Sequence, residues 1–260
     1  MPELPDVELF RRYLNASALH QCLKDVEVRE PRILDHVSAA EFRSFLRKKS
    51  FEGTLRHGKN LLVQTNGSRL VRFHFGMTGF VKYFKTSDEG VHHVRIRFHF
   101  QNGYTLVYCC RRLFGRVSLE NSMEAFAEVN GLGPDAMEVS LQEFREIISG
   151  SRQAVKSLLM NQSKLAGLGN LYADEVLFQS RVHPKHKAGD LGEQQVEEIY
   201  GEIHRILDYA IACKANPNKF SKSYLLPHRG KEGTCPRCGT PLKHIKVSGR
   251  TSYFCPNCQT

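Results

Sequence analysis

The chain has 260 residues, of which 41% are apolar, 37 are Lys or Arg and 27 are Asp or Glu. This length and apolar content exclude a disordered chain and predict one large or two ordinary globular domains. The sequence contains no run of about 18 apolar residues and no signal-peptide core, so we expect neither membrane insertion nor secretion. The net charge of +10 and the pI near 9.3 favour a polyanion-binding protein. In many basic proteins, however, the charge serves only to keep the protein soluble.

The first half of the chain reads as one helix followed by strands. Val7, Phe10 and Leu14 lie at helical spacing and predict a helix over residues 4–19. Five short runs then predict strands separated by Gly and Asn turns: "LKDVEVRE", "NLLVQT", "RLVRFHF", "VHHVRIRFHF" and "YTLVYCC". In the fourth run apolar and polar residues alternate, which indicates a sheet with one buried and one polar face.

After about residue 121 the apolar period changes from two to 3.6. Ser140 and Glu143 form a capping-box signature before an apolar stripe, and Gly150 follows where that helix would end. Further helices are predicted over residues 152–160, 171–180 and 193–213. Strands first and helices second predict an α+β chain with a β-rich domain and an α-rich domain.

Four of the eight cysteines form two C-x2-C pairs separated by sixteen residues. They are Cys235, Cys238, Cys255 and Cys258. Two such pairs at the base of a hairpin predict a tetrahedral S4 site for one structural zinc ion, with iron as the competing metal. The ribbon carries several Lys and Arg and no Asp or Glu from Cys235 to Thr260, which suits contact with phosphates or is simply a solvated basic surface. The remaining cysteines are expected to be ordinary thiols: Cys22, Cys109, Cys110 and Cys213.

Two further stretches suggest chemistry. In "KLAGLGNLYADEVLF" two glycines precede Asn170, a good N-cap residue, at a predicted helix start whose amides could bind an anion. The same pattern also occurs at an ordinary helix–turn–helix corner. The chain opens "MPELPDVE", where Pro2 would present a secondary amine as the free N-terminus once Met1 is removed. The alternative is that these residues only start the first helix tightly.

Six motifs in order resemble the formamidopyrimidine-DNA glycosylase and endonuclease VIII family over essentially the whole chain: Pro2-Glu3, "HGKNLLV", "HFGMTG", "LFGRV", "LAGLGNLYADEVLF" and "GRTSYFCPNCQ". The resemblance implies a bifunctional DNA glycosylase and AP lyase. It also implies an N-terminal catalytic β-sandwich domain with the first helix, a helix–two-turn–helix domain and a zinc finger. The expected domain ranges are 1–120, a linker at 121–137, 138–228 and 229–260.

The resemblance gives the N-terminal residues catalytic roles. The Pro2 amine would attack the deoxyribose C1′ and hold the sugar as an iminium ion. Glu3 would protonate the opening sugar ring and shuttle protons, unless it only caps the first helix. Lys59 matches a family lysine that reaches the phosphate and the lesion, although a lysine at a strand edge is often only solvated. Asp6 is expected to support these residues without being catalytic.

The remaining matches concern DNA binding. Met77 is a candidate wedge for the stack vacated by a flipped nucleotide, and Arg112 and Phe114 are candidates for contact with the orphaned base. His74, Asn170, Glu175 and Arg250 complete the predicted DNA-binding set. The chain departs from the purine-excising pattern Arg-Arg-Phe-Gly because it reads "RRLFG", so that Leu113 either replaces the second arginine or shifts the register. The segment between Cys213 and Cys235 is also short. The lesion and opposite-base preferences therefore stay open.

The leading interpretation is a monomeric base-excision repair enzyme. Its partner would be double-stranded DNA containing oxidised bases or abasic sites, in the cytoplasm of a bacterium in association with the nucleoid, or in a eukaryotic nucleus. One alternative is a catalytically silent damaged-DNA-binding protein on the same scaffold, against which Pro2, Glu3 and Lys59 together argue. Another is an RNA-binding zinc-ribbon protein, which would leave the N-terminus unexplained.

Overall fold

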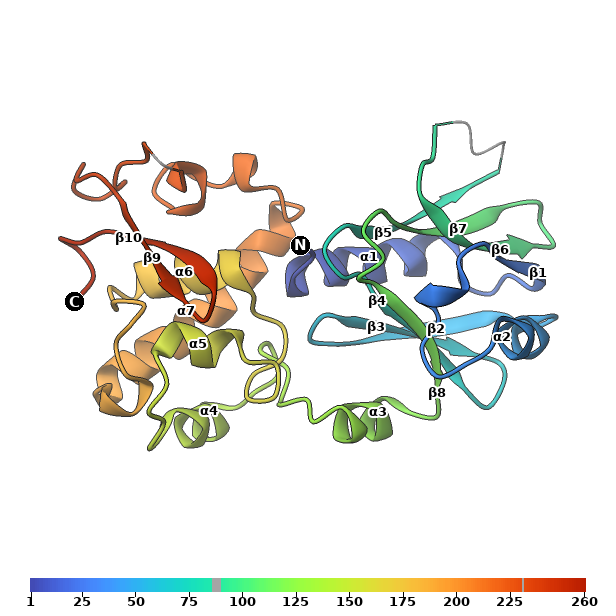
Figure 1. Cartoon of the computed structure of the whole chain (residues 1–260), viewed down its shortest axis with the longest axis horizontal. Coiled ribbons are helices and arrows are strands. Elements are labelled where there is room, and N and C mark those ends of the chain that lie inside the picture. The colour runs from blue at the N-terminus through green and yellow to red at the C-terminus, as the bar shows by residue number, and fades with distance from the viewer. Residues whose placement is uncertain (86–89, 231) are drawn as a thin grey trace. The chain divides into compact units, whose positions relative to one another are not determined.

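The computed structural model describes residues 1–85, 90–230 and 232–260 and separates into two units, Met1–Asn130 and Gly131–Thr260 (Figure 1). The first unit contains two four-stranded sheets in which all paired strands are antiparallel. One sheet has the order β1 (Leu23–Val28), β6 (Val94–Phe100), β7 (Thr105–Cys110) and β5 (Gly79–Phe84). The other has the order β2 (Phe51–His57), β3 (Asn60–Thr65), β4 (Leu70–His74) and β8 (Arg116–Glu120).

The core of the first unit lies between these sheets. Phe73 from one sheet and Phe98 and Tyr108 from the other are fully buried, with ring centroids 5.8 Å apart in both the Phe73–Phe98 and Phe73–Tyr108 pairs. In β6 the alternation predicted from sequence is observed, because Val94, Ile96, Phe98 and Phe100 are buried and the residues between them are not. The period-two pattern therefore holds in β6, whereas β3, β4 and β7 are buried over several consecutive residues.

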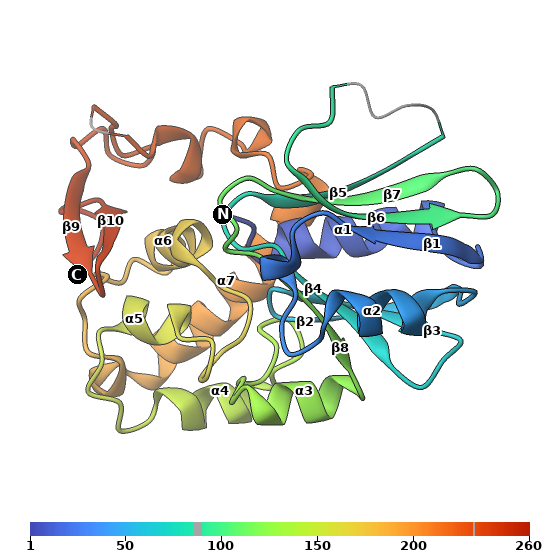
Figure 2. The ribbon, with the colours of Figure 1, turned by 45° about the vertical axis from the view of Figure 1, so that its right-hand side comes forward.

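Helix α1 (Leu4–Ser17) packs against β2 and β3 of one sheet and β5 of the other (Figure 2). Its Val7 and Leu14 are fully buried in the sandwich core. Helix α2 (Ala39–Leu46), capped by the Ser38 side chain, packs on β1, and helix α3 (Met123–Val129), capped by Ser122, packs on β2 and β8. A short 3-10 helix, η1, spans Pro31–Ile33.

The second unit is helical apart from its last segment. Its α-helices are α4 (Leu141–Ile148), α5 (Val155–Met160), α6 (Asn170–Gln179) and α7 (Glu193–Ala212). Its 3-10 helices are η2 (Ala188–Asp190), η3 (Pro217–Lys219) and η4 (Leu226–His228). The apolar stripe of α7 is buried as predicted, and the Ser140–Glu143 capping box is formed at the start of α4.

A two-stranded ribbon of β9 (Lys243–Val247) and β10 (Arg250–Phe254) ends the chain. Ser248 and Gly249 link the strands with φ values of 47° and 73°, as a tight two-residue hairpin turn requires. The ribbon shares an apolar cluster with the rest of its unit, because Phe178 of α6 and Leu225 pack with Cys235, Leu242 and Cys255. The finger is thus built partly from α6.

The α-helices α2 and α3 and the strands β2, β5 and β8 were not predicted, and α3 lies inside the segment predicted as a linker. The predicted helix over 152–160 begins later, at Val155, because Ala154 has a non-helical ψ of 137° and pairs with Lys187. Across residues 1–85, 90–230 and 232–260, no helix has both the length and the apolar character needed to cross a membrane.

Candidate functional site

The predicted nucleophile and its neighbour stand at the start of α1. Pro2 is half-buried, and Glu3, the N-cap residue, is 1% exposed. Asp6 accepts a hydrogen bond from the Glu3 backbone N–H at 2.9 Å, and the two residues form a reciprocal capping box. Burial raises the pKa of Asp6, while its hydrogen bond to Glu3 opposes that rise. The capping role that the sequence offered as an alternative is therefore present, and it holds Glu3 beside Pro2.

Helix α1 is tied to the hairpin that carries Lys59. Glu8 of α1 lies 3.5 Å from Arg56 of β2, measured from Oε2 to Nε, and Arg56 donates to the carbonyl of Gly58 at 3.3 Å. Burial would raise the pKa of Glu8, but hydrogen bonds from Arg11 and Arg12 together with nearby positive charge lower it to about 2. Glu8 is therefore a carboxylate at any ordinary pH.

Lys59 occupies the two-residue turn between β2 and β3, next to Gly58, whose φ of 54° favours glycine. Directly behind the turn, His57, Asn60, His74 and Arg116 face one another across the four strands of the sheet. Lys59 is half-buried and His74 ends β4 in the same row. The sheet register thus brings the predicted residues Lys59 and His74 to one edge.

His74 is neutral over the physiological range. Burial is the main cause, and the positive charges of Arg72, Lys59 and Arg116 add to it, so that the pKa falls to about 4. The backbone carbonyl of His74 accepts a hydrogen bond from the Tyr108 hydroxyl at 2.8 Å. A neutral imidazole there can donate one hydrogen bond to a phosphate oxygen without carrying charge.

Met77, Arg112 and Phe114 come from two turns that touch. Met77 lies between β4 and β5, where a Cβ on Gly76 would meet the Phe114 carbonyl carbon at 2.5 Å. The Arg112 backbone N–H donates to Thr78 Oγ1 at 3.4 Å. Arg112 is exposed, Phe114 is 57% exposed and Met77 is half-buried. The structure therefore gathers the three predicted DNA contacts in one place.

The Leu113 side chain in "RRLFG" packs away from that place. Leu113 has a φ of 56° and packs on the apolar core of the sandwich, while Arg112 before it and Phe114 after it are exposed. Leu113 therefore takes no exposed position that a second arginine would hold. Leu113 reaches the core through a backbone conformation in the left-handed region.

Asn170 is the first residue of α6, and the N-cap is Gly169, so the prediction of Asn170 as N-cap was wrong by one position. The backbone reason is that Gly169 has the extended conformation of a cap residue, with φ −131° and ψ −158°. The Asn170 side chain instead accepts a hydrogen bond through Oδ1 from Nζ of the buried Lys156 at 2.7 Å.

Glu175 lies inside the second unit and is 0% exposed. Its carboxylate accepts from the backbone N–H groups of Leu225 at 3.1 Å and Leu226 at 2.8 Å, and from Gln179 at 2.8 Å. Burial raises its pKa, which these hydrogen bonds oppose. A carboxylate with this surrounding positions the segment that leads to the finger.

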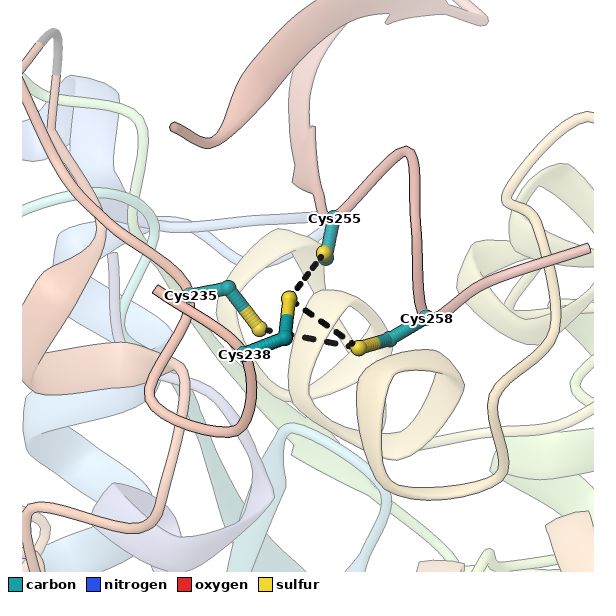
Figure 3. A group of neighbouring side chains, drawn as sticks. All are labelled: Cys235, Cys238, Cys255 and Cys258. Atoms are coloured by element: carbon teal, nitrogen blue, oxygen red, sulfur yellow. Dashed lines mark hydrogen bonds between the residues drawn. The ribbon is translucent and has the colours of Figure 1, made fainter. Parts of the chain in front are cut away.

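The four cysteines of the two C-x2-C pairs meet as predicted (Figure 3). Their Sγ atoms all lie within 4.8 Å of one another, and the Cys238–Cys255 and Cys235–Cys258 pairs are 3.5 and 3.9 Å apart. A tetrahedral zinc ion with Zn–S bonds of about 2.3 Å separates its ligands by about 3.8 Å. The four thiols therefore fit one closed, structural zinc site. The other cysteines are buried or half-buried free thiols.

Arg250 is exposed and opens β10 at the tip of the ribbon, opposite Val247. Arg250 directly follows the Ser248-Gly249 turn. It therefore lies at the turn of the hairpin, whereas the cysteine pairs lie beyond the other ends of the two strands. The hairpin thus presents a guanidinium on a metal-stabilised support.

Sequence reasoning missed the buried ionic cluster of Lys156, Asp174 and Arg229, in which Asp174 pairs with both basic residues. The available signal was a charged residue within each of two otherwise largely buried helices, α5 and α6. Which partner each charge would meet is not visible in the chain order.

Comparisons with known proteins agree along the chain. Residues 1–117 match the formamidopyrimidine-DNA glycosylase N-terminal domain, 131–222 the H2TH domain of the same enzyme, and 233–260 the zinc finger found in FPG and IleRS. A formamidopyrimidine-DNA glycosylase of Streptococcus mutans is 33% identical, with 100% of this chain and 99% of that protein covered.

Solved structures give the same result. The Lactococcus lactis enzyme bound non-covalently to DNA containing an AP site is 29% identical with a TM-score of 0.90, and both chains are covered completely. A structure of MutM with DNA containing carbocyclic 8-oxo-G is 30% identical with a TM-score of 0.91, again over both complete chains. The predicted fold class and the predicted zinc cofactor are confirmed.

Proposed function

The chain belongs to the formamidopyrimidine-DNA glycosylase family, and on that premise we propose which of its residues perform the reaction. It is a base-excision repair DNA glycosylase with AP lyase activity, and its substrate is DNA containing lesions or abasic sites. The observation that carries the residue assignment is the start of α1, where the capping box with Asp6 holds the buried Glu3 next to Pro2.

Pro2, freed by removal of Met1, acts as the nucleophile. An α-amino group titrates at about 7.7 to 8.0, so a useful fraction is neutral near pH 7, whereas a lysine amine must first be perturbed. The neutral amine attacks C1′ of the deoxyribose and the bond from C1′ to the base breaks. Because proline is a secondary amine, the resulting Schiff base is an iminium ion that stays charged.

Glu3 moves the protons that this sequence requires. It protonates the ring oxygen as the C1′–O bond opens, and the iminium ion then acidifies C2′ so that the 3′ phosphate leaves by β-elimination. Water finally releases the sugar fragment and restores the amine. Lys59 and His74, at the edge of the sheet, hold the phosphate beside the reacting sugar by charge and by a neutral hydrogen bond.

The remaining residues hold the duplex. Met77 fills the stack that the flipped nucleotide leaves, and Arg112 and Phe114 from the adjoining turn meet the orphaned base. Asn170 and Arg250 bind phosphates, which supplies affinity without reading sequence. Glu175 acts indirectly, through the backbone of Leu225 and Leu226. Zinc, when bound, fixes the two cysteine knuckles and has no open position for chemistry.

Substrate range and location complete the proposal. Leu113 faces the core, so the exposed Arg112 and Phe114 determine the opposite-base preference, and the short segment after Cys213 favours oxidised pyrimidines and hydantoins beside purines. One chain acts alone, in the bacterial cytoplasm and on nucleoid DNA.

Borohydride trapping on an oligonucleotide with an abasic site tests the nucleophile. Processed protein should give a covalent adduct that peptide mapping places at residue 2. A matched preparation that retains Met1, verified by mass, should give none, because its Pro2 nitrogen is an amide. An adduct mapped to a lysine would assign the nucleophile to that residue instead of Pro2, and no adduct from processed protein would favour the silent DNA-binding alternative.

A further inference from the structure

The ionic cluster between α5, α6 and the ribbon is almost completely buried. Lys156 is 0% exposed and Asp174 is 1% exposed, and Lys156 Nζ lies 2.7 Å from Asp174 Oδ1. Burying a charged pair costs several kcal/mol of desolvation for each ion, so such a pair is weak support for stability alone. The pair is better explained by the way it orients the side chains and backbone around it.

The first arm of the cluster reaches Asn170. Lys156 Nζ donates to Asn170 Oδ1 at 2.7 Å, within the same unit. An ammonium group can only donate, so the atom that faces it must be the amide oxygen. The Asn170 amide nitrogen is thereby turned to the other side as a donor. The orientation that a phosphate oxygen needs is set by Lys156, which Asp174 in turn holds in place.

The second arm reaches the zinc ribbon. Asp174 Oδ2 accepts from Arg229 Nε at 2.9 Å and from the Tyr253 backbone N–H at 3.2 Å. Arg229 also donates to the Thr251 carbonyl at 3.2 Å and lies 4.8 Å from the centroid of the Tyr253 ring. Both ribbon contacts fall in β10, the strand that Arg250 begins. One carboxylate therefore fixes the ribbon strand against α6.

We propose that Asp174 is a positioning residue that fixes Asn170 and Arg250 in one register, so that both reach the DNA backbone together. This rests on the proposed function, in which these two residues bind phosphates. Lys156 Nζ bridges the side chains of Asp174 and Asn170, and the β10 backbone links Asp174 to the strand that Arg250 begins. The carboxylate matters for binding because it couples two contacts far apart in sequence.

A double-mutant cycle tests the coupling. Asp174→Asn should weaken binding to a duplex with a stable abasic-site analogue by about tenfold, and by about threefold or less when Arg250→Ala is already present, because a misplaced contact cannot be lost twice. The control is Arg237→Gln. Arg237 also joins the finger to α6, through the carbonyls of Phe178 and Gln179, but at the opposite end of the helix from Asn170. Arg237→Gln should change DNA affinity by the same factor whether or not Arg250→Ala is present.

Arg229→Gln gives the same test if Asp174→Asn does not fold or does not retain zinc, because it leaves the Lys156–Asp174 pair intact. It removes the Arg229 contacts of the ribbon arm and leaves the Asn170 arm unchanged, so its effect should be non-additive with Arg250→Ala and additive with Asn170→Ala. If Asp174→Asn and Arg229→Gln each weaken DNA binding by the same factor with and without Arg250→Ala, the coupling is overturned, while the proposed function stands. Unchanged binding by Arg250→Ala itself would remove Arg250 from the proposed site, and the coupling with it.

Discussion

At the scale of single residues, burial decides what a polar group can do. Glu175 belongs to a motif that implied DNA contact, yet the structure buries its carboxylate among backbone N–H groups. His74 keeps its place at the sheet edge but loses its charge, because burial and neighbouring cations lower its pKa. Sequence identifies both residues, whereas their charge state and exposure come from the packing around them.

The low pKa of His74 predicts a specific pH dependence of stability. Its pKa falls from 6.5 to about 4 on folding, so the unfolded chain binds the proton more tightly. The stabilisation is present above pH 6.5 and is lost as the pH falls toward 4. Between pH 7 and pH 5, about 2 kcal/mol of unfolding free energy should disappear. Urea unfolding of the parent and of His74→Gln should show this loss in the parent only; parallel pH profiles would contradict it.

At the scale of elements, periodicity predicted the long or strongly patterned segments. It indicated α1, α7 and the alternating strand β6, because one face of each meets a core. It also indicated α6, which is buried over all of residues 172–178. It missed α2 and α3, which have eight and seven residues and so show hardly two turns of pattern. The Ser38 cap of α2 was a readable signal, with Glu41 three residues later, but it stood among strands.

The site was predictable to a similar degree. The cysteine spacing alone predicted the metal centre, because two C-x2-C pairs on one hairpin rarely form anything other than a four-cysteine metal site. The grouping of Met77 with Phe114 was not, because it depends on Gly76 meeting a backbone 38 positions later. The Lys156–Asp174 pair was likewise invisible, as it requires knowing how two helices pack.

The shared cluster of the finger predicts that zinc loss spreads into α6. Removing the metal, by chelation or by Cys238→Ser, should unfold the ribbon and lower DNA affinity, because metal binding contributes to its folding energy. Amide hydrogen exchange should accelerate over residues 233–260 and at the end of α6 near Phe178, and stay unchanged over 1–85 and 90–130. Cys213→Ser, which alters a thiol outside the cluster, is the control. Slow exchange in the metal-free ribbon would contradict the prediction.

At the scale of the whole molecule, a net charge of +10 makes DNA affinity depend on salt. Each phosphate contact contributes about 0.9 to the slope of log K against log salt concentration. Arg250→Ala should therefore reduce the magnitude of the slope by about one and weaken binding to damaged and undamaged DNA alike. Lys243→Ala is the control, since Lys243 is exposed at the opposite end of the same hairpin. Equal slopes for Arg250→Ala and parent would exclude this contact.

The apolar cluster beneath the ribbon limits which segments of this protein can be transferred to another protein. Residues 233–260 match a finger family of their own, which invites treating them as a transferable cassette. Phe178 of α6 and Leu225, however, lie outside residues 233–260 and complete the finger's interior. A graft of the last 28 residues onto another protein would leave Leu242 and the cysteine knuckles without their cover, and the donor would expose Phe178. Exchange between relatives should succeed only when the finger moves together with α6.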